Sequence, residues 1–370
     1  MFIRTVHKRS LLSIFISAAI IGAAIIMLRF PQALANGVSR GLSVCSSVII
    51  PTLYPFMILA GVLTDSPLCT RPNAVLDRVT RRLFGLPGCC GTAIFLSLVG
   101  GYPAGALAIG RLQHSGCIST DEARRMTLFC VNGGPGFIVS TVGAGLLGSA
   151  RAGWLLFAAH ATTSIGTGIV IARTNKANKA TAQEPLHAIA PSRAFADTVK
   201  DTCAALLTMC GFVVLAAAGL SVWEATDLPL TLQTVSGIPA TAWSTAAAVL
   251  TEVSCGCIAL TGGGTLSPFW LCLCLGWGGL SVQGQLAVAL NGQRGDTILT
   301  RTFWLGRLVH GCVSGLIATL LFRFIPVDLP TINQPVSTPF FASPSASTML
   351  LILSFTAMLC FYPKKTGNLS

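Results

Sequence analysis

The chain has 370 residues, of which 52% are hydrophobic and only 10% are charged, and its mean hydropathy is +0.73. Soluble domains carry about 25% charged residues, so this composition excludes a soluble globular protein and indicates a polytopic protein of the lipid bilayer. The formal net charge of +12 does not indicate nucleic-acid binding. Lys and Arg lie in short connectors between apolar runs, which is typical of cytoplasmic loops of membrane proteins.

The first two apolar runs are Leu11–Leu28 and Leu42–Leu63. The first is long enough for one crossing, but the pattern Ala33-Leu34-Ala35 after it would also suit a cleaved signal peptide. We expect a retained first span, with cleavage as the alternative. The second run contains Pro51 and Pro55, which neighbouring helices tolerate within a membrane.

The next two apolar runs, residues 91–112 and 126–147, are each interrupted near the middle. The interruptions are Gly100-Gly101-Tyr102-Pro103 and Asn132-Gly133-Gly134-Pro135. Gly and Pro free backbone groups for which lipid offers no partner, so such breaks persist only where they face protein or a polar cavity. In transporters they mark the substrate site. Between the runs, Ser119 and Glu122 have the spacing of a capping box, which predicts a helix start near Thr120.

A fifth apolar run, Trp154–Ile171, is followed by a polar and basic segment at 173–200 that divides the chain into halves. The second half repeats the rhythm of the first. Its loop at 223–244 carries Glu224 and Asp227 and no Lys or Arg. Its apolar runs are 202–222, 245–260, 268–290 (interrupted at Gly276–Gln283), 303–324 and, after a linker rich in Pro, Ser and Thr, 348–361.

The charge distribution decides the topology. If all ten runs crossed the membrane, the most basic loop would lie outside, against the positive-inside rule. If 91–112 and 245–260 enter and return on the same side, 19 of the 24 Lys and Arg lie inside and four outside, with Arg307 in the membrane. We therefore predict an all-α polytopic membrane protein with about eight transmembrane helices, two re-entrant segments and cytoplasmic termini.

This topology makes the two halves inverted repeats, an architecture typical of secondary transporters. Residues 42–172 form the first repeat and 200–324 the second, because both follow the series span, re-entrant segment, broken span and span, from opposite sides. The predicted remaining parts are an N-terminal helix and connector at 1–41, a basic cytoplasmic linker at 173–199, and a loop with a C-terminal helix at 325–370.

Several motifs resemble one known family. They are SVIIPTLYPFMILAGVL (47–63), LVGGYPAGA (98–106), GFVVLAAAGL (211–220), LTEVSCG (250–256), GGLSVQGQ (278–285) and RLVHG (307–311). Together they resemble the sporulation integral membrane protein family typified by YlbJ, within the wider nucleoside-recognition or gate-domain membrane proteins. The resemblance implies a fold like concentrative nucleoside transporters. It also implies transport of a small anion, dipicolinic acid during sporulation, and a location in the bacterial cell membrane or the outer forespore membrane.

Glu252 lies inside a short apolar run, and an ionisable group at membrane depth is a functional candidate. Three roles for Glu252 stay open: it binds a coupling cation, it takes up a proton, or it only caps the segment. Arg307 and His310 are three residues apart and share one helical face. A guanidinium forks onto carboxylates, but Arg307 would alternatively reach the cytoplasmic surface or pair with Glu252.

The broken segments add further candidates. Exposed helix N-termini attract anions, the amides of Asn and Gln supply donors and acceptors, and Tyr102 offers a face for a planar ring; close helix packing through small residues is the alternative. The predicted substrate-binding residues are Gly100, Gly101, Tyr102, Asn132, Gly133, Gly134, Glu252, Ser281, Gln283, Gln285, Arg307 and His310.

The chain shows no paired CxxC, HExxH or Walker A motif, so we expect neither an enzyme nor a metal site nor a cofactor beyond H⁺ or Na⁺ coupling. The predicted function is a secondary transporter of a small anionic or aromatic metabolite. A nucleoside-type transporter and a non-transporting membrane scaffold in spore formation are the alternatives. The predicted partners are lipid and a small-molecule substrate, and homo-oligomerisation stays open.

Overall fold

The structure of the protein is a computed structural model. It describes residues 20–65, 74–174, 191–262, 267–290 and 298–327, together with positions 14, 17 and 18. Within these residues the chain is helical and has no strand. Six stretches there are long and apolar enough to cross a membrane: Pro31–Pro55, Cys90–His114, Ala150–Thr174, Phe195–Ala225, Pro268–Leu290 and Arg301–Phe324. The predicted span at 348–361 lies outside the described residues, as do positions 11–13, 15, 16 and 19 of the span predicted at 11–28.

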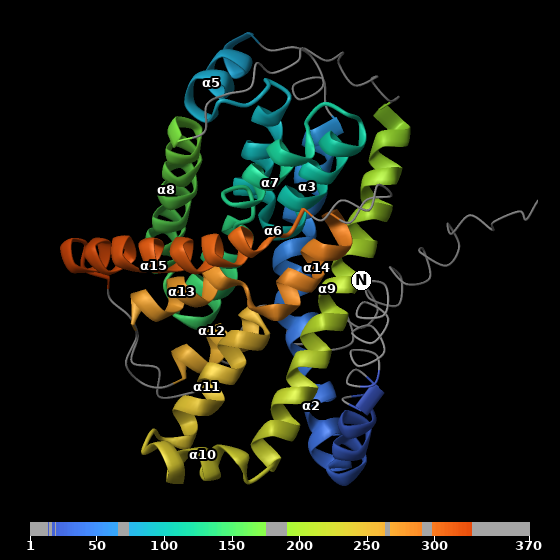
Figure 1. Cartoon of the computed structure of the whole chain (residues 1–370), viewed down its shortest axis with the longest axis vertical. Helices are drawn as coiled ribbons and strands as arrows, with labels where there is room; N and C mark the ends of the chain where they lie inside the picture. The colour runs from blue at the N-terminus through green and yellow to red at the C-terminus, as the bar shows by residue number, and fades with distance from the viewer. Residues whose placement is uncertain are drawn as a thin grey trace, which may run out of the picture.

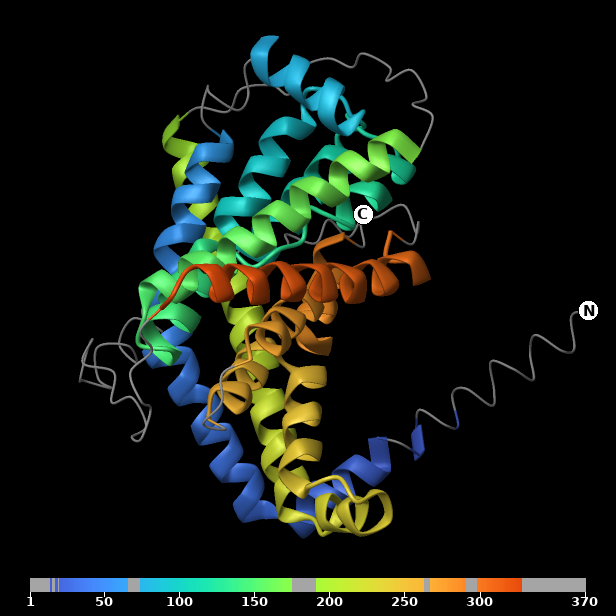
Figure 2. The same cartoon turned by 90° about the vertical axis from the view of Figure 1, so that its left-hand side faces the viewer.

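A short apolar helix, Ile20–Arg29, overlaps the first predicted span. One long helical run follows it. It consists of α2 (Pro31–Val44), a π-helical turn at Cys45–Ile49, and α3 (Ile50–Asp65). It packs along α9 (Pro191–Ala225), as Figures 1 and 2 show. The predicted connector before Leu42 is therefore wrong. Pro31 at the first helical position favours a helix start there, and packing of the following turns on α9 holds them helical.

Helix α6 (Cys90–His114) folds back on itself. Gly101 interrupts it with φ 81° and ψ −168°, a backbone conformation that residues with a side chain rarely adopt. A Cβ on Gly105 would lie 2.9 Å from the Cβ of Ser97, although a straight helix separates these positions by about 12 Å. The predicted segment 91–112 is thus a helical hairpin whose tip is at Gly101.

Helices α11 (Ala240–Thr251) and α12 (Val253–Thr261) form a second hairpin. Glu252 between them is extended, with φ −152° and ψ 133°. A Cβ on Gly256 would lie 2.9 Å from the Cα of Val249, whereas seven residues of straight helix span about 10 Å. The tip of this hairpin is Glu252, and the single apolar run predicted at 245–260 is two helices.

The two hairpins enter from opposite ends of the molecule. Helix α5 (Ala74–Phe84), which leads into the first, lies at one end of the long axis, and α10 (Leu228–Ser236), which leads into the second, lies at the other (Figures 1 and 2). Both short helices lie in segments that were predicted to be connectors. The hairpin tips consequently point toward the middle of the molecule.

Each hairpin is followed by a broken helix, at the predicted places. In the first half, α7 (Thr120–Thr127) and the π-helical η2 (Gly136–Leu146) flank the break. In the second, α13 (Pro268–Trp277) and α14 (Gly279–Leu290) flank Gly278. The predicted capping box is confirmed: the Ser119 hydroxyl accepts from the Glu122 N–H (3.2 Å), and the Glu122 carboxylate accepts from the Ser119 N–H (2.8 Å).

Helices α8 (Ala150–Thr174) and α15 (Arg301–Phe324) complete the two halves. Helix α15 packs along α13 and against α8. In both Figure 1 and Figure 2 it lies across the long axis of the molecule, whereas α3 and α9 run along it. Its length and hydropathy suit a span, but its direction differs from that of the other long helices.

Candidate functional site

In each half, the hairpin tip sits against the glycine at the break of the following helix. A Cβ on Gly134 would lie 2.8 Å from the backbone nitrogen of Gly101, and a Cβ on Gly279 would lie 2.8 Å from the Cα of Glu252. Neither contact leaves room for a side chain. The same arrangement of hairpin tip and helix break therefore occurs twice in the chain.

Both tips line one small pocket, which has a cavity volume of about 30 Å³, enough for about one or two water-sized groups. Glu252 and Gln285 are among the residues that line it. Helices α3 and α9 close it with apolar side chains. Six of the predicted site residues lie around this pocket: Gly100, Gly101, Tyr102, Gly134, Glu252 and Gln285.

Glu252 has a defined local role in the second tip. Its carboxylate accepts from the backbone N–H of Cys255 at 2.8 Å, so it caps the N-terminus of α12. The side chain is only 2% exposed. None of the ion pairs among the described residues includes it, so the predicted pairing with Arg307 is not present. Glu252 therefore both caps α12 and is one of the residues that line the pocket.

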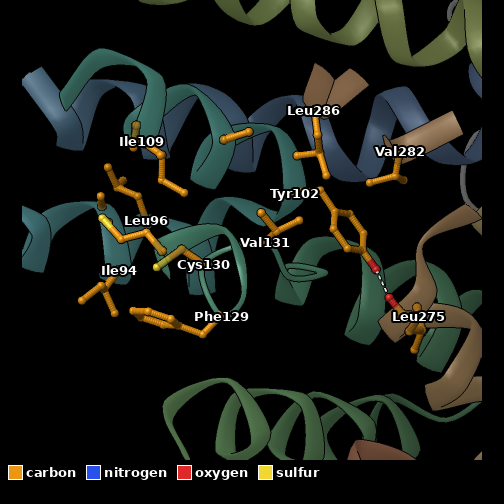
Figure 3. Close-up of a cluster of buried hydrophobic side chains, with 14 of the residues drawn as sticks. Ile94, Leu96, Tyr102, Ile109, Phe129, Cys130, Val131, Leu275, Val282 and Leu286 are labelled. Carbon is orange, nitrogen blue, oxygen red and sulfur yellow. Dashed lines mark hydrogen bonds between the residues drawn. The ribbon is translucent and has the colours of Figure 1, made fainter. Parts of the chain in front are cut away.

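Tyr102 connects the first tip to the second broken helix. Its hydroxyl donates to the carbonyl oxygen of Leu275 near the end of α13, and its ring lies beside Val282 and Leu286 (Figure 3). The last carbonyls of a helix lack an intrahelical donor, and the break at Gly278 places such carbonyls in the interior. Tyr102 supplies one of the missing donors and thereby links the two halves.

A larger cavity of about 340 Å³ adjoins the pocket. The two share four residues: Tyr102, Pro103, Val282 and Gln285. The larger cavity runs between α6, α9 and α14, and it includes Arg111 and Asp201, whose side chains form an ion pair at 2.7 Å. These two side chains are about half exposed, so the cavity extends from the protein surface toward the hairpin tips.

Arg307 and His310 do not line the pocket; they belong to a separate buried cluster. His310 packs on His160 of α8, with Nε2 of His310 and Nδ1 of His160 3.1 Å apart and ring centroids 5.3 Å apart. Arg307, His310 and His160 are each 1% exposed. The prediction that Arg307 reaches the cytoplasmic surface is therefore wrong.

The remaining predicted residues lie around the breaks, and all are buried. Asn132 donates to the carbonyl of Phe129 (2.7 Å) and to the hydroxyl of Ser164 (2.9 Å). Gln283 donates to the carbonyl of Trp277 at 3.3 Å. Three polar atoms of these residues have no hydrogen-bond partner within the described part of the chain: Asn132 Oδ1, Ser281 Oγ and Gln283 Oε1. Gly133 packs against Tyr102 and Ile138.

His160 was not among the predicted site residues, although an ionisable residue within an apolar span is itself a signal. The sequence also contains the spacing GxSxG, at Gly37–Gly41. That spacing belongs to a nucleophile elbow only at a turn between strand and helix, and here it lies inside α2. The described residues contain no group of His, Cys, Asp and Glu that would hold a metal ion.

The fold and site together define an integral membrane protein built from helical hairpins and broken helices. No family model matches the chain, and no solved structure matches it. The chain is 26% identical over 326 residues to the sporulation integral membrane protein YlbJ of Bacillus subtilis (strain 168), covering 79% of this chain and 78% of that protein. This similarity supports its membership in that sporulation membrane protein family, which the motifs predicted.

Proposed function

We propose that the protein is a secondary transporter of a small anionic or aromatic metabolite. One observation carries the proposal: the tips of two hairpins that enter from opposite ends meet at one pocket beside a surface cavity. Alternating access needs a site that closures on either side can reach in turn. The proposal includes no catalytic step.

In the proposed topology, the two halves are inverted repeats, and both hairpins are re-entrant. Two ion pairs support this arrangement. Arg40 and Glu224, which the charge distribution predicts to be outside, pair at 3.6 Å. Arg111 and Asp201, at the ends of segments predicted to be cytoplasmic, pair at 2.7 Å. The larger cavity would then face the cytoplasm.

The proposed substrate enters the larger cavity, because the pocket at the tips is too small for an organic molecule as it stands. A volume of about 340 Å³ lies within the range of small-molecule sites. Tyr102 and Gln285 would meet a planar, hydrogen-bonding solute there. Dipicolinate, which the family resemblance implies, is the first substrate to test, with a nucleoside as the alternative substrate.

The test is uptake of radiolabelled dipicolinate or uridine into proteoliposomes containing the full chain, under an imposed H⁺ or Na⁺ gradient. We expect Glu252→Gln to abolish gradient-driven uptake, because the amide cannot exchange a proton or hold a cation. Glu224→Gln is the matched control, since Glu224 is half exposed and remote from the pocket. Equal uptake by both variants would remove Glu252 from the mechanism.

A non-transporting scaffold remains the competing function, and water access distinguishes it. Thr208→Cys, which lines the larger cavity, is labelled with a charged thiol reagent in a background with exposed Cys89 and Cys312 replaced by Ser. If the protein is a transporter, the cysteine at position 208 should be labelled, and substrate should slow the labelling. Labelling that no solute affects, together with no uptake, favours the scaffold.

A further inference from the structure

The cluster of Arg307, His310 and His160 lies where α15 packs against α8. Arg307 and His310 are three residues apart on α15, so they are neighbours on one helical face, and both side chains are buried. One nitrogen of each imidazole is used in the contact between the rings. The cluster thus brings a fixed positive charge beside two titratable rings in the protein interior.

The polar atoms of this cluster are largely unsatisfied. Within the described part of the chain, Nη1 and Nη2 of Arg307, Nε2 of His160 and Nδ1 of His310 have no hydrogen-bond partner. The ion pairs found among these residues do not include Arg307. A buried charge without a counter-charge is strongly unfavourable, and buried donors without acceptors add to that penalty.

We propose that Arg307, His160 and His310 form a buried binding site for one small anion, either a halide or the carboxylate of an organic solute. A guanidinium presents a planar fork of N–H donors that matches a carboxylate. In the shared hydrogen bond between the imidazoles one ring donates, so the ring that accepts carries its own N–H on its free nitrogen. That N–H is a further donor to the anion.

This anion site is distinct from the pocket between the hairpin tips. Tyr102 lines the pocket, whereas Arg307, His160 and His310 do not. The residues of the two sites differ, and so do the helices that supply them. The anion site does not depend on the protein being a transporter, since a bound anion would neutralise Arg307 in either case.

The experiment is titration calorimetry on the full chain in lipid nanodiscs, at constant ionic strength in sodium methanesulfonate. Sodium chloride and sodium benzoate are the two probes. We expect one anion to bind per chain and to raise the melting temperature, because it binds the native state. If chloride displaces benzoate, the two anions bind at the same site. If only one of the two probes binds, the site is specific for a halide or for a carboxylate accordingly.

Variants locate the binding. We expect Arg307→Gln to weaken anion binding about tenfold or more, the loss expected for hydrogen bonds to a charged group. His160→Gln, a milder change, should also weaken it, and Arg301→Gln, on the exposed start of the same helix, should not. Absence of binding to the wild-type chain, or unchanged binding in both cluster variants, overturns the proposal. Anion binding without uptake supports this site and contradicts only the proposed transport.

Discussion

The hydroxyl of Tyr102, at the tip of the first hairpin, donates to the carbonyl oxygen of Leu275, at the end of the first part of the second broken helix (Figure 3). The two residues are 173 positions apart in the chain. This contact satisfies a carbonyl near the helix break at Gly278. It also joins the two halves directly beside the pocket, so it is expected to affect both stability and transport.

Tyr102→Phe tests this contact. Removal of the hydroxyl leaves the buried Leu275 carbonyl without that donor, which costs about 1–3 kcal/mol. We expect a lower melting temperature for the full chain in detergent micelles. Tyr54→Phe is the matched control, because the Tyr54 hydroxyl has only a weak contact with the Cys203 thiol at 3.9 Å. An equal fall in melting temperature in both variants would show that the hydrogen bond from Tyr102 to Leu275 does not stabilise the protein.

Two substitutions of Glu252, by Gln and by Ala, should distinguish its role as a helix cap from a role in transport. Gln retains an oxygen that accepts from the Cys255 N–H, whereas Ala removes it, and loss of an N-cap costs about 0.5–2 kcal/mol. We therefore expect Glu252→Ala to lower the melting temperature more than Glu252→Gln, while both lose gradient-driven uptake. If Glu252→Gln keeps full uptake, the carboxylate serves only as a cap.

Gly134→Ala should separate a hairpin tip from its helix break. The added methyl group would lie 2.8 Å from the nitrogen of Gly101, and such overpacking costs about 1–3 kcal/mol. Gly211→Ala is the control, because no atom lies within 4 Å of a Cβ there, and Ala favours a helix interior over Gly. We expect loss of stability in the first variant and none in the second, measured by thermal unfolding; a stable Gly134→Ala would contradict the close contact.

The proposed topology places the two ends of the molecule on opposite sides of the membrane. Single cysteines at Arg78 and Glu224 should react with an impermeant thiol reagent from opposite sides, and a cysteine at Arg173 should behave like the one at Arg78. Sided labelling of intact cells and inverted vesicles measures this. Reaction of all three positions from one side would exclude hairpins that enter from opposite sides.

Helix α15 needs a separate test, because it lies across the long axis (Figures 1 and 2). Its 24 residues suffice to cross a bilayer, so we expect cysteines at Arg301 and Arg323 to be labelled from opposite sides. Labelling of both from the same side would show that this helix does not cross. The repeats would then lack a matching final span.

Local patterns predicted one helix start and the two helix breaks. Ser119 and Glu122 are sufficient to define a helix start, because both partners of a capping box lie within three residues. The breaks at Asn132–Pro135 and Gly278–Gly279 follow from Gly and Pro themselves. The helices α2, α5 and α10 were not predicted, because their stretches are short or weakly apolar and packing on neighbouring helices stabilises them.

The predicted site residues lie in two separate places, which the sequence could not show. Tyr102, Glu252 and Gln285 do meet at one pocket, but Arg307 and His310 lie in another cluster with His160. Spacing within one helix shows which residues share a face, but not which helix that face meets. The pairing of α15 with α8 decides that the partner of His310 is a histidine 150 positions away in the chain.

By itself, the amino-acid sequence determined that this protein belongs in a membrane, where its backbone breaks lie, and which buried groups are ionisable. These properties depend on composition and on residues close together in the chain. Only the tertiary structure decided that the two hairpin tips meet at one pocket and that Arg307 is buried with no ion-pair partner among the residues that the structure describes. Such contacts join residues far apart in the chain, and they depend on how whole helices pack.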